Sequence, residues 1–202
     1  MLKNCTALIV ADNSQKRWRL EDLVAAADFG EIRAFSNVPI IAQTMDLQTL
    51  LCLIDGKCED DKIRETLEEV RECSEVDVSM MPMILLGGPY TDIEVKRYIK
   101  MGLDDIVSLP MDSHPLRQRL LGQFDCRIEY FRTDTYFGPD RRRGIGLSGS
   151  RVQTGTGYQK VTFARKPGAG VRLLSIDVHR AKVEPAVAQP TTTALAVDFE
   201  TC

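Results

Sequence analysis

Short apolar runs alternate with amphipathic stretches along the first 124 residues. Strands are predicted at 6–10, 32–35, 47–54, 81–86 and 105–109, because each run is short and ends in polar or turn-forming residues. Helices are predicted from Asn13 or Ser14 to Gly30 and at 37–45, 59–73, 91–101 and 113–124. The helix at 59–73 is the most regular and the helix at 37–45 is the weakest.

Five strands that alternate with five helices predict an α/β fold with a doubly wound, five-stranded parallel sheet, as in flavodoxin-like proteins. The run at 47–54 is almost continuously apolar, which is typical of a parallel strand covered on both faces. Ligands of such sheets bind at the carboxyl ends of the strands. We therefore expect a site where Asp12, Asp55, Gly87 and Leu109 converge.

The regular pattern ends after residue 124, and the chain divides into three parts. Residues 1–124 form the predicted α/β domain, 125–144 form an aromatic and arginine-containing extension, and 145–202 form a tail. The tail is first basic and then Ala/Pro/Thr-rich, so we expect it to be largely disordered, with one weak hairpin at 160–165 and 171–178.

Charge is distributed unevenly between these parts. Residues 1–123 contain 14 Lys/Arg and 21 Asp/Glu, a net charge of −7, whereas the rest of the chain has a net charge of +4. Within residues 139–182, ten Lys/Arg stand against Asp140 and Asp177. This basic segment is a candidate for contact with an acidic partner.

Two classes of protein are disfavoured by composition. No apolar run reaches the roughly 18 residues that a membrane span needs, so we expect no membrane span and a cytoplasmic location. The six cysteines form no CxxC pair and have no histidine nearby, which argues against a zinc site and a disulfide framework.

Three motifs in order resemble those of response-regulator receiver domains. The sequence ALIVADN at 7–13 resembles the first strand and acidic pair of that family, and LCLID at 51–55 resembles the strand ending in the phosphoacceptor aspartate. The sequence GLDDIVSLP at 102–110 resembles the fifth-strand motif. The resemblance covers residues 4–124 and implies two-component (phosphorelay) signalling, in which a histidine kinase transfers a phosphoryl group to the aspartate.

Most of the residues that serve this chemistry in the family are replaced. The family holds Mg²⁺ with two acidic residues and contacts the phosphoryl group with a Ser/Thr and a Lys. Here Ala11 precedes Asp12, Gly87 takes the hydroxyl position and Leu109 takes the lysine position. Asp55 remains the candidate phosphoacceptor, and Asp12 with Asp55 would form a weak Mg²⁺ site.

The lost contacts are large enough to affect function. Each missing charge-assisted hydrogen bond is worth about 1.5–3 kcal/mol, and these bonds couple phosphorylation to the switch. The resemblance therefore implies a degenerate receiver, or pseudo-receiver, that binds a histidine kinase or a downstream protein. We expect no enzymatic activity and no catalytic residue, and Mg²⁺ binding is doubtful.

The extension contains a further motif. Residues 133–143, TDTYFGPDRRR, resemble a segment that follows receiver-type domains in some alphaproteobacterial response regulators. Tyr136 and Phe137 form an aromatic anchor that could dock on the domain or on a partner. Arg141, Arg142 and Arg143 offer planar donors for carboxylates or phosphates.

Other readings stay open. Asp55 could be a working phosphoacceptor, or residues 139–182 could bind nucleic acid, although no helix-turn-helix pattern accompanies the basic residues. A nucleotide-binding enzyme is disfavoured because residues 11–15 contain no glycine-rich loop. The fourth helix carries Glu94, Lys96, Arg97 and Lys100 as candidate partner contacts. The oligomeric state is not predicted.

Overall fold

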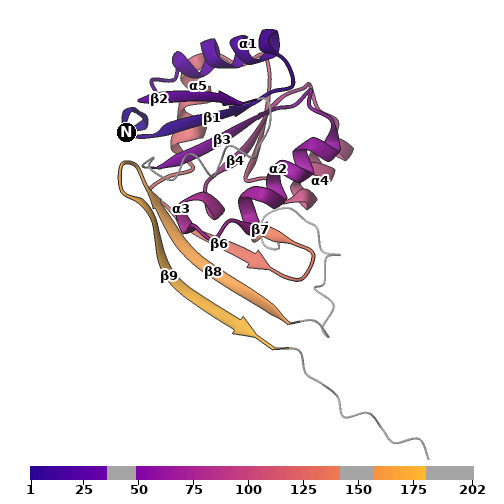
Figure 1. The fold of residues 1–202 in the computed structure, drawn as a ribbon, viewed down its shortest axis with the longest axis vertical. Coiled ribbons are helices and arrows are strands. Elements are labelled where there is room, and N and C mark those ends of the chain that lie inside the picture. The colour runs from indigo at the N-terminus through magenta and orange to yellow at the C-terminus, as the bar shows by residue number, and fades with distance from the viewer. Residues whose placement is uncertain (36–48, 142–156, 181–202) are drawn as a thin grey trace, which may run out of the picture.

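The computed structural model describes residues 1–35, 49–141 and 157–180. These residues form two sheets that pack against each other, as Figure 1 shows. One sheet has five strands and the other has four. The predicted weak helix at 37–45 lies outside the described residues.

The five-stranded sheet and its helices come from residues 1–121. Its strands are β1 (Thr6–Val10), β2 (Glu31–Phe35), β3 (Leu50–Asp55), β4 (Met83–Gly87) and β5 (Asp105–Ser108). The helices are η1 (Leu2–Asn4), α1 (Ser14–Ala25), α2 (Asp60–Glu72), α3 (Val76–Ser79), α4 (Asp92–Met101) and α5 (Ser113–Leu121). The strand order is β2-β1-β3-β4-β5 and every neighbouring pair is parallel. The predicted doubly wound fold is confirmed.

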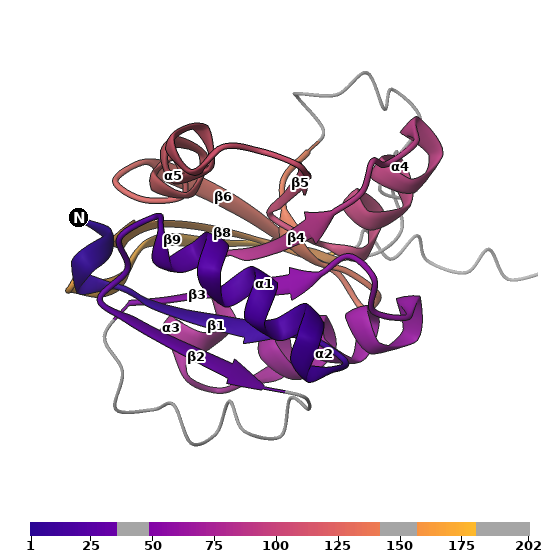
Figure 2. The same ribbon diagram turned by 90° about the horizontal axis from the view of Figure 1, so that it is seen from above.

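Alternation along the strands divides the apolar core into two layers. In β1, Ala7 and Ile9 pack with Val24 of α1 and Leu116 of α5, whereas Leu8 lies in the other layer with residues of α2, α3 and α4. Helices therefore cover both faces of the sheet (Figure 2). All residues of β1, β3 and β4 are buried, which explains their nearly continuous apolar sequences.

Two short helices of this part were not predicted. η1 has three residues, and α3 is a single turn of four residues with two apolar side chains, Val76 and Val78. The other elements begin or end within a few residues of their predicted bounds. Among the described residues, no helix has both the length and the apolar character that crossing a membrane requires.

The four-stranded sheet is the main difference from the predicted organisation. Its strands are β6 (Arg127–Arg132), β7 (Phe137–Pro139), β8 (Tyr158–Lys166) and β9 (Gly170–His179), in the order β7-β6-β8-β9 and all antiparallel. The hairpin predicted in the tail is present, but it is longer and pairs with β6. The extension and part of the tail thus form one sheet, and the remainder of the tail, 181–202, lies outside the described residues.

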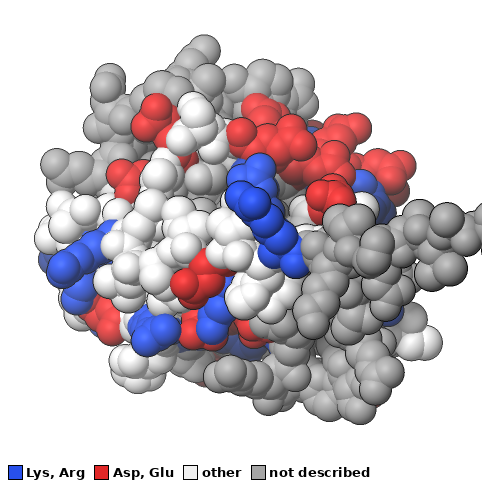
Figure 3. Space-filling model, turned by 90° about the horizontal axis from the view of Figure 1, so that it is seen from below, with Lys and Arg blue, Asp and Glu red and all other residues white. Residues whose placement is uncertain are grey.

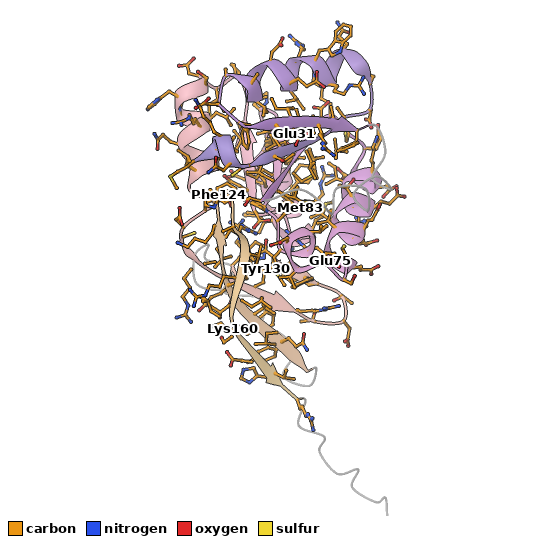
Figure 4. All side chains as sticks on the ribbon, turned by 60° about the vertical axis from the view of Figure 1, so that its left-hand side comes forward. Glu31, Glu75, Met83, Phe124, Tyr130 and Lys160 are labelled. Atoms are coloured by element: carbon orange, nitrogen blue, oxygen red, sulfur yellow. The ribbon has the colours of Figure 1, made fainter. Side chains whose placement is uncertain are left out.

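Asp104 joins the two sheets at a buried junction. Its carboxylate accepts hydrogen bonds from Arg71 Nη2 at 2.8 Å, Arg165 Nη2 at 2.8 Å, the Tyr130 hydroxyl at 2.5 Å and the Met83 backbone N–H at 2.8 Å. The side chains of Asp104, Arg71 and Arg165 are at most 4% exposed. Figure 4 shows Tyr130 between the two sheets, with Met83 on the side of the parallel sheet.

The second sheet docks at the amino ends of the parallel strands. Thr49, which precedes β3, donates to the Lys166 carbonyl and accepts from the backbone N–H of Gly168 at 2.8 Å. Asp77 of α3 accepts from the backbone N–H of Val171 at the start of β9. The opposite edge of the parallel sheet, where the predicted site lies, is therefore not covered by this second sheet.

Candidate functional site

The predicted site residues meet at the carboxyl edge of the parallel sheet. Asp55 ends β3 and lies opposite Leu86 of β4, and Gly87 ends β4 opposite Ser108. The Leu109 backbone N–H donates to the Gly87 carbonyl at 2.6 Å, which continues the sheet beyond β5. The strand ends thus place Asp55, Gly87 and Leu109 in neighbouring strands, as the sequence predicted.

Asp55 is buried, and only one of its two carboxylate oxygens is paired. The residue is 6% exposed. Oδ1 accepts from the Lys57 backbone N–H at 3.1 Å, whereas Oδ2 is buried without a hydrogen-bond partner among the described residues. Burying a carboxylate oxygen without a hydrogen-bond partner lowers the stability of the folded protein, and such groups are often functional or bind a further ligand.

The cation beside the acidic residues comes from α2. Lys62 Nζ lies 2.7 Å from Asp12 Oδ1, and the two side chains are 23% and 31% exposed. The Cys58 thiol lies near both aspartates; burial and then the negative charges of Asp12 and Asp55 raise its pKa to about 12. Lys62 lies 50 residues from Asp12 in the chain, and the packing of α2 brings the two together.

Tyr90 is a second residue of this site, after Lys62, that was not predicted from the sequence. Its hydroxyl lies 1.8 Å from the position that a Cβ on Gly56 would take and 2.6 Å from that of a Cβ on Gly87. The hydroxyl is buried without a partner among the described residues. Burial, followed by Tyr98 and the Asp55 carboxylate, raises the pKa of Tyr90 above its usual value.

Tyr90 therefore fills the space that two side chains would occupy in a different sequence. Glycine at both 56 and 87 leaves room for its ring and hydroxyl between the ends of β3 and β4. The only signal in the sequence was this pair of glycines at two strand ends, followed by a tyrosine three residues after Gly87. The space that a Ser or Thr side chain at position 87 would occupy is thus taken by Tyr90.

The residues present fit a magnesium ion poorly. Ala11 offers no side-chain ligand, and Asp12 is already in an ion pair with Lys62. In the described ranges, no three His, Cys, Asp or Glu side chains are grouped so that they could hold a metal ion. A Mg²⁺ site with few carboxylates loses much of its affinity when one is missing.

The predicted partner-binding residues of the extension contact their own chain. Phe137 packs edge-on against Tyr130 with ring centroids 5.8 Å apart, and the Tyr136 hydroxyl donates to the Pro139 carbonyl at 2.9 Å. Arg141 donates to the carbonyls of Leu103 and Asp104. Of the two alternatives given for the aromatic pair, these contacts favour docking on the chain itself, and Arg141 has the same kind of contact. Arg142 and Arg143 lie outside the described residues.

Much of the described positive charge of residues 139–182 is neutralised within the fold. Arg165 is buried against Asp104, Lys160 lies 3.0 Å from Glu129, and Lys166 lies 2.7 Å from Asp125. These lysines and this arginine read as a basic patch in the sequence because their acidic partners are distant in the chain. The described part of this segment therefore offers less free charge to nucleic acid than the sequence suggested.

The fourth helix presents the side chains that the sequence analysis named for partner contact. Lys96 and Lys100 are exposed, and Arg97 forms an ion pair with Asp60 of α2 at 2.8 Å. Ile93 is 80% exposed on the same helix. An open groove of about 280 Å³ lies between α2, α4 and residues 132–137.

Known families and solved structures give the following comparison. No family model matches the chain, and no curated protein matches it. A response-regulator receiver domain from Bacteroides fragilis is 24% identical, with a TM-score of 0.46; the match covers 58% of this chain and 94% of that one. A chemotaxis response regulator of Vibrio cholerae is 16% identical, with a TM-score of 0.46 and coverages of 58% and 97%.

A third solved structure was obtained with a metal ion. The receiver domain of a sensor histidine kinase from Pseudomonas aeruginosa has magnesium coordinated in its active-site cleft. It is 16% identical, with a TM-score of 0.46 and coverages of 58% of this chain and 94% of that one. Matches at this level carry no argument about function, so the proposal below depends on the chain's own residues.

Proposed function

We propose that the protein is a receiver-like signalling module of the two-component type that acts by binding other proteins and is not switched by phosphorylation of Asp55. The observation that carries this proposal is the arrangement around Asp55. The Tyr90 hydroxyl fills the space beside Gly56 and Gly87, and Lys62 neutralises Asp12. The protein is then a cytoplasmic binding module without enzymatic activity.

The physical argument concerns what a phosphoryl group on Asp55 would meet. Its three oxygens would need donors and a cation, because charge-assisted bonds supply most of the stabilisation. Gly87 and Leu109 bring neither a hydroxyl nor an ammonium group to this edge of the sheet. An acyl phosphate at Asp55 would therefore lack the contacts that connect it to the adjacent loops.

A working phosphoacceptor is the second candidate function, and one observation favours it. Among the described residues, neither Asp55 Oδ2 nor the buried Tyr90 hydroxyl has a hydrogen-bond partner. A ligand that accepts from Tyr90 and neutralises Asp55 would satisfy both groups. This candidate requires that the Tyr90 side chain moves, because its hydroxyl lies against Gly56 and Gly87.

The proposed binding surface lies on α4. The exposed side chains of Ile93, Lys96 and Lys100 combine an apolar contact with positive charge. Such a surface fits a protein partner with an apolar pocket bordered by acidic groups. A histidine kinase or a downstream signalling protein is the proposed partner, and nucleic acid is not.

A calorimetric Mg²⁺ titration distinguishes the two candidates. The proposal predicts that the wild-type protein and Asp55→Asn give the same weak or absent heat, because Asp12 is neutralised by Lys62. Asp61→Asn, an exposed aspartate on α2, is the matched control for loss of one charge. Saturable binding by wild type and the control that is lost in Asp55→Asn would overturn the proposal.

A further inference from the structure

Strand β9 is a long edge strand that no other described strand covers, and it has few of the features that usually protect such an edge. It is the last strand in the order β7-β6-β8-β9 and spans Gly170–His179, ten residues. Natural edge strands are commonly short, or they carry lysine or proline, because an open edge pairs readily with another chain. β9 contains no lysine and no proline, and its charged residues are Arg172 and Asp177.

Large apolar side chains are concentrated on this strand. Leu173, Leu174, Ile176 and Val178 are 40%, 50%, 54% and 59% exposed, and they are half of the large apolar side chains exposed in the described residues. Figure 1 shows that β8 and β9 extend beyond the parallel sheet at the bottom of the view. Figure 3, seen from that side, shows a largely uncharged surface there with a few separate charges.

A bulge decides which side chains of β9 share a face. Thr162 of β8 lies opposite Ser175 and Phe163 lies opposite Leu173, so Leu174 has no partner on β8. Before the bulge, Val171 and Leu173 lie on the face of Phe163. After it, Ile176 and Val178 lie on that same face, while Arg172 and Asp177 lie on the opposite face.

We propose that β9 pairs antiparallel with β9 of a second copy, centred between Leu174 and Ser175. In this register Leu173 lies opposite Ile176 of the second copy and Val171 lies opposite its Val178. Directly opposite residues of an antiparallel pair project to the same face. Leu173 and Ile176 would lie on opposite faces of a regular strand, but the bulge places both on one face, and it does the same for Val171 and Val178. The two four-stranded sheets then form one continuous sheet of eight strands.

Charge complementarity is the reason for a second copy as the occupant. The same register places Arg172 opposite Asp177 of the second copy, and the two-fold symmetry of a dimer makes this pair twice. Both side chains are exposed, and neither is in an ion pair with another described residue. A strand whose apolar pairs and opposite charges match its own reversed sequence is self-complementary, which an unrelated partner strand does not require.

The test is the mass in solution of the full-length chain and of charge variants, measured by sedimentation over a range of concentrations. Wild type is expected to dimerise. Arg172→Asp and Asp177→Arg each place like charges opposite one another twice, so each is expected to weaken self-association by about tenfold. An equimolar mixture of these two variants restores opposite charges and is expected to form a heterodimer. The double variant Arg172→Asp/Asp177→Arg also restores opposite charges and is expected to form a homodimer.

The control variants carry the same charge changes far from β9. Arg19→Asp and Asp22→Arg alter exposed residues of α1, at the opposite end of the molecule in Figure 1. They are expected to dimerise like wild type. A monomeric wild type at all concentrations would overturn the proposal, and so would charge variants that all dimerise equally. Neither result depends on whether Asp55 is phosphorylated, so this test is separate from that of the proposed function.

Discussion

At the scale of single residues, the buried Asp104 connects the two sheets. Its carboxylate accepts four hydrogen bonds, two of them from arginines, Arg71 of α2 and Arg165 of β8, and its side chain is 4% exposed. Burial acts to raise the pKa of Asp104, but the charges of Arg165 and Arg71, together with the hydrogen bonds from Tyr130 and Arg165, lower it, and the net shift is downward. The two arginines would be uncompensated without this carboxylate.

Asp104→Asn is therefore expected to destabilise the protein by about 3–5 kcal/mol, because it leaves buried charges without their partner. The neighbouring Asp105→Asn is the control, since Asp105 pairs with Arg119, whose side chain is 43% exposed. That control should cost no more than about 1 kcal/mol. Urea denaturation measures both, and equal losses would contradict the role given to Asp104.

The lowered pKa of Asp104 also fixes the sign of a pH effect. A carboxyl group whose pKa is lower in the folded state stabilises that state above its unfolded pKa, near 3.8. This contribution decreases as the pH falls below that value toward the folded pKa. Wild type should therefore lose stability more steeply than Asp104→Asn in this acid range.

Tyr90 supplies a second prediction at this scale. Its buried hydroxyl has no partner in the described part of the chain, so Tyr90→Phe should cost little or raise stability slightly. Tyr130→Phe is the matched comparison, because that hydroxyl donates to Asp104, and its loss should cost about 1–3 kcal/mol. Thermal unfolding of both variants checks this. A Tyr90→Phe loss as large as that of Tyr130→Phe would mean that Tyr90 has a bound partner.

At the scale of elements, two glycines explain part of the motif at 133–143. A Cβ on Gly138 of β7 would lie 2.9 Å from both Cα and the carbonyl oxygen of Gly102. Gly102 ends α4 with a φ of 107°. A Cβ on Gly102 would lie 3.0 Å from the carbonyl oxygen of Phe137. The backbones of α4 and β7 therefore approach so closely that neither position has room for a side chain.

Gly138→Ala is expected to destabilise the protein by about 1–3 kcal/mol, since backbone atoms and not a flexible side chain must move. Gly122→Ala, at the end of α5, is the control, because its φ of −61° suits alanine and its nearest contact is 3.3 Å. That change should be neutral or slightly stabilising. Chemical denaturation compares them, and a neutral Gly138→Ala would contradict the close approach.

The elements also show how far the sequence predicts this fold. β1, β3 and β4 were predictable because each is buried on both faces, which gives a continuous apolar run that ends at a polar turn. The sheet of β6 to β9 was not, because residues 140–157 separate two of its strands and its buried Arg165 resembles surface charge in the sequence.

The candidate site divides in the same way. Asp12 and Asp55 were placed correctly because strand ends fix their positions in a parallel sheet. Lys62 and Tyr90 were not, because each reaches the site from a different element, and only tertiary packing brings it there. The aromatic pair Tyr136 and Phe137 was predicted to be an anchor. The sequence could not show what it contacts, because Phe137 packs on Tyr130 of β6, which belongs to the sheet that was not predicted.

At the scale of the whole molecule, the two ends of the parallel sheet serve different purposes. The amino ends of the strands carry the second sheet, joined through Asp104, Thr49 and Asp77. The carboxyl ends hold Asp55 with Tyr90, Asp12 and Lys62. The chain thus combines a five-stranded parallel α/β domain with an added sheet whose last described strand is an edge, and its own side chains fill the space at the carboxyl ends of β3 and β4.

The most direct test of this account is the intact mass of the protein after incubation with acetyl phosphate and Mg²⁺. The account predicts that wild type and Asp55→Asn keep identical, unmodified masses, because the site lacks the metal ligand, hydroxyl and lysine that would support the adduct. A mass increase of one phosphoryl group in wild type that is absent from Asp55→Asn would contradict it and would identify the protein as a working phosphoacceptor.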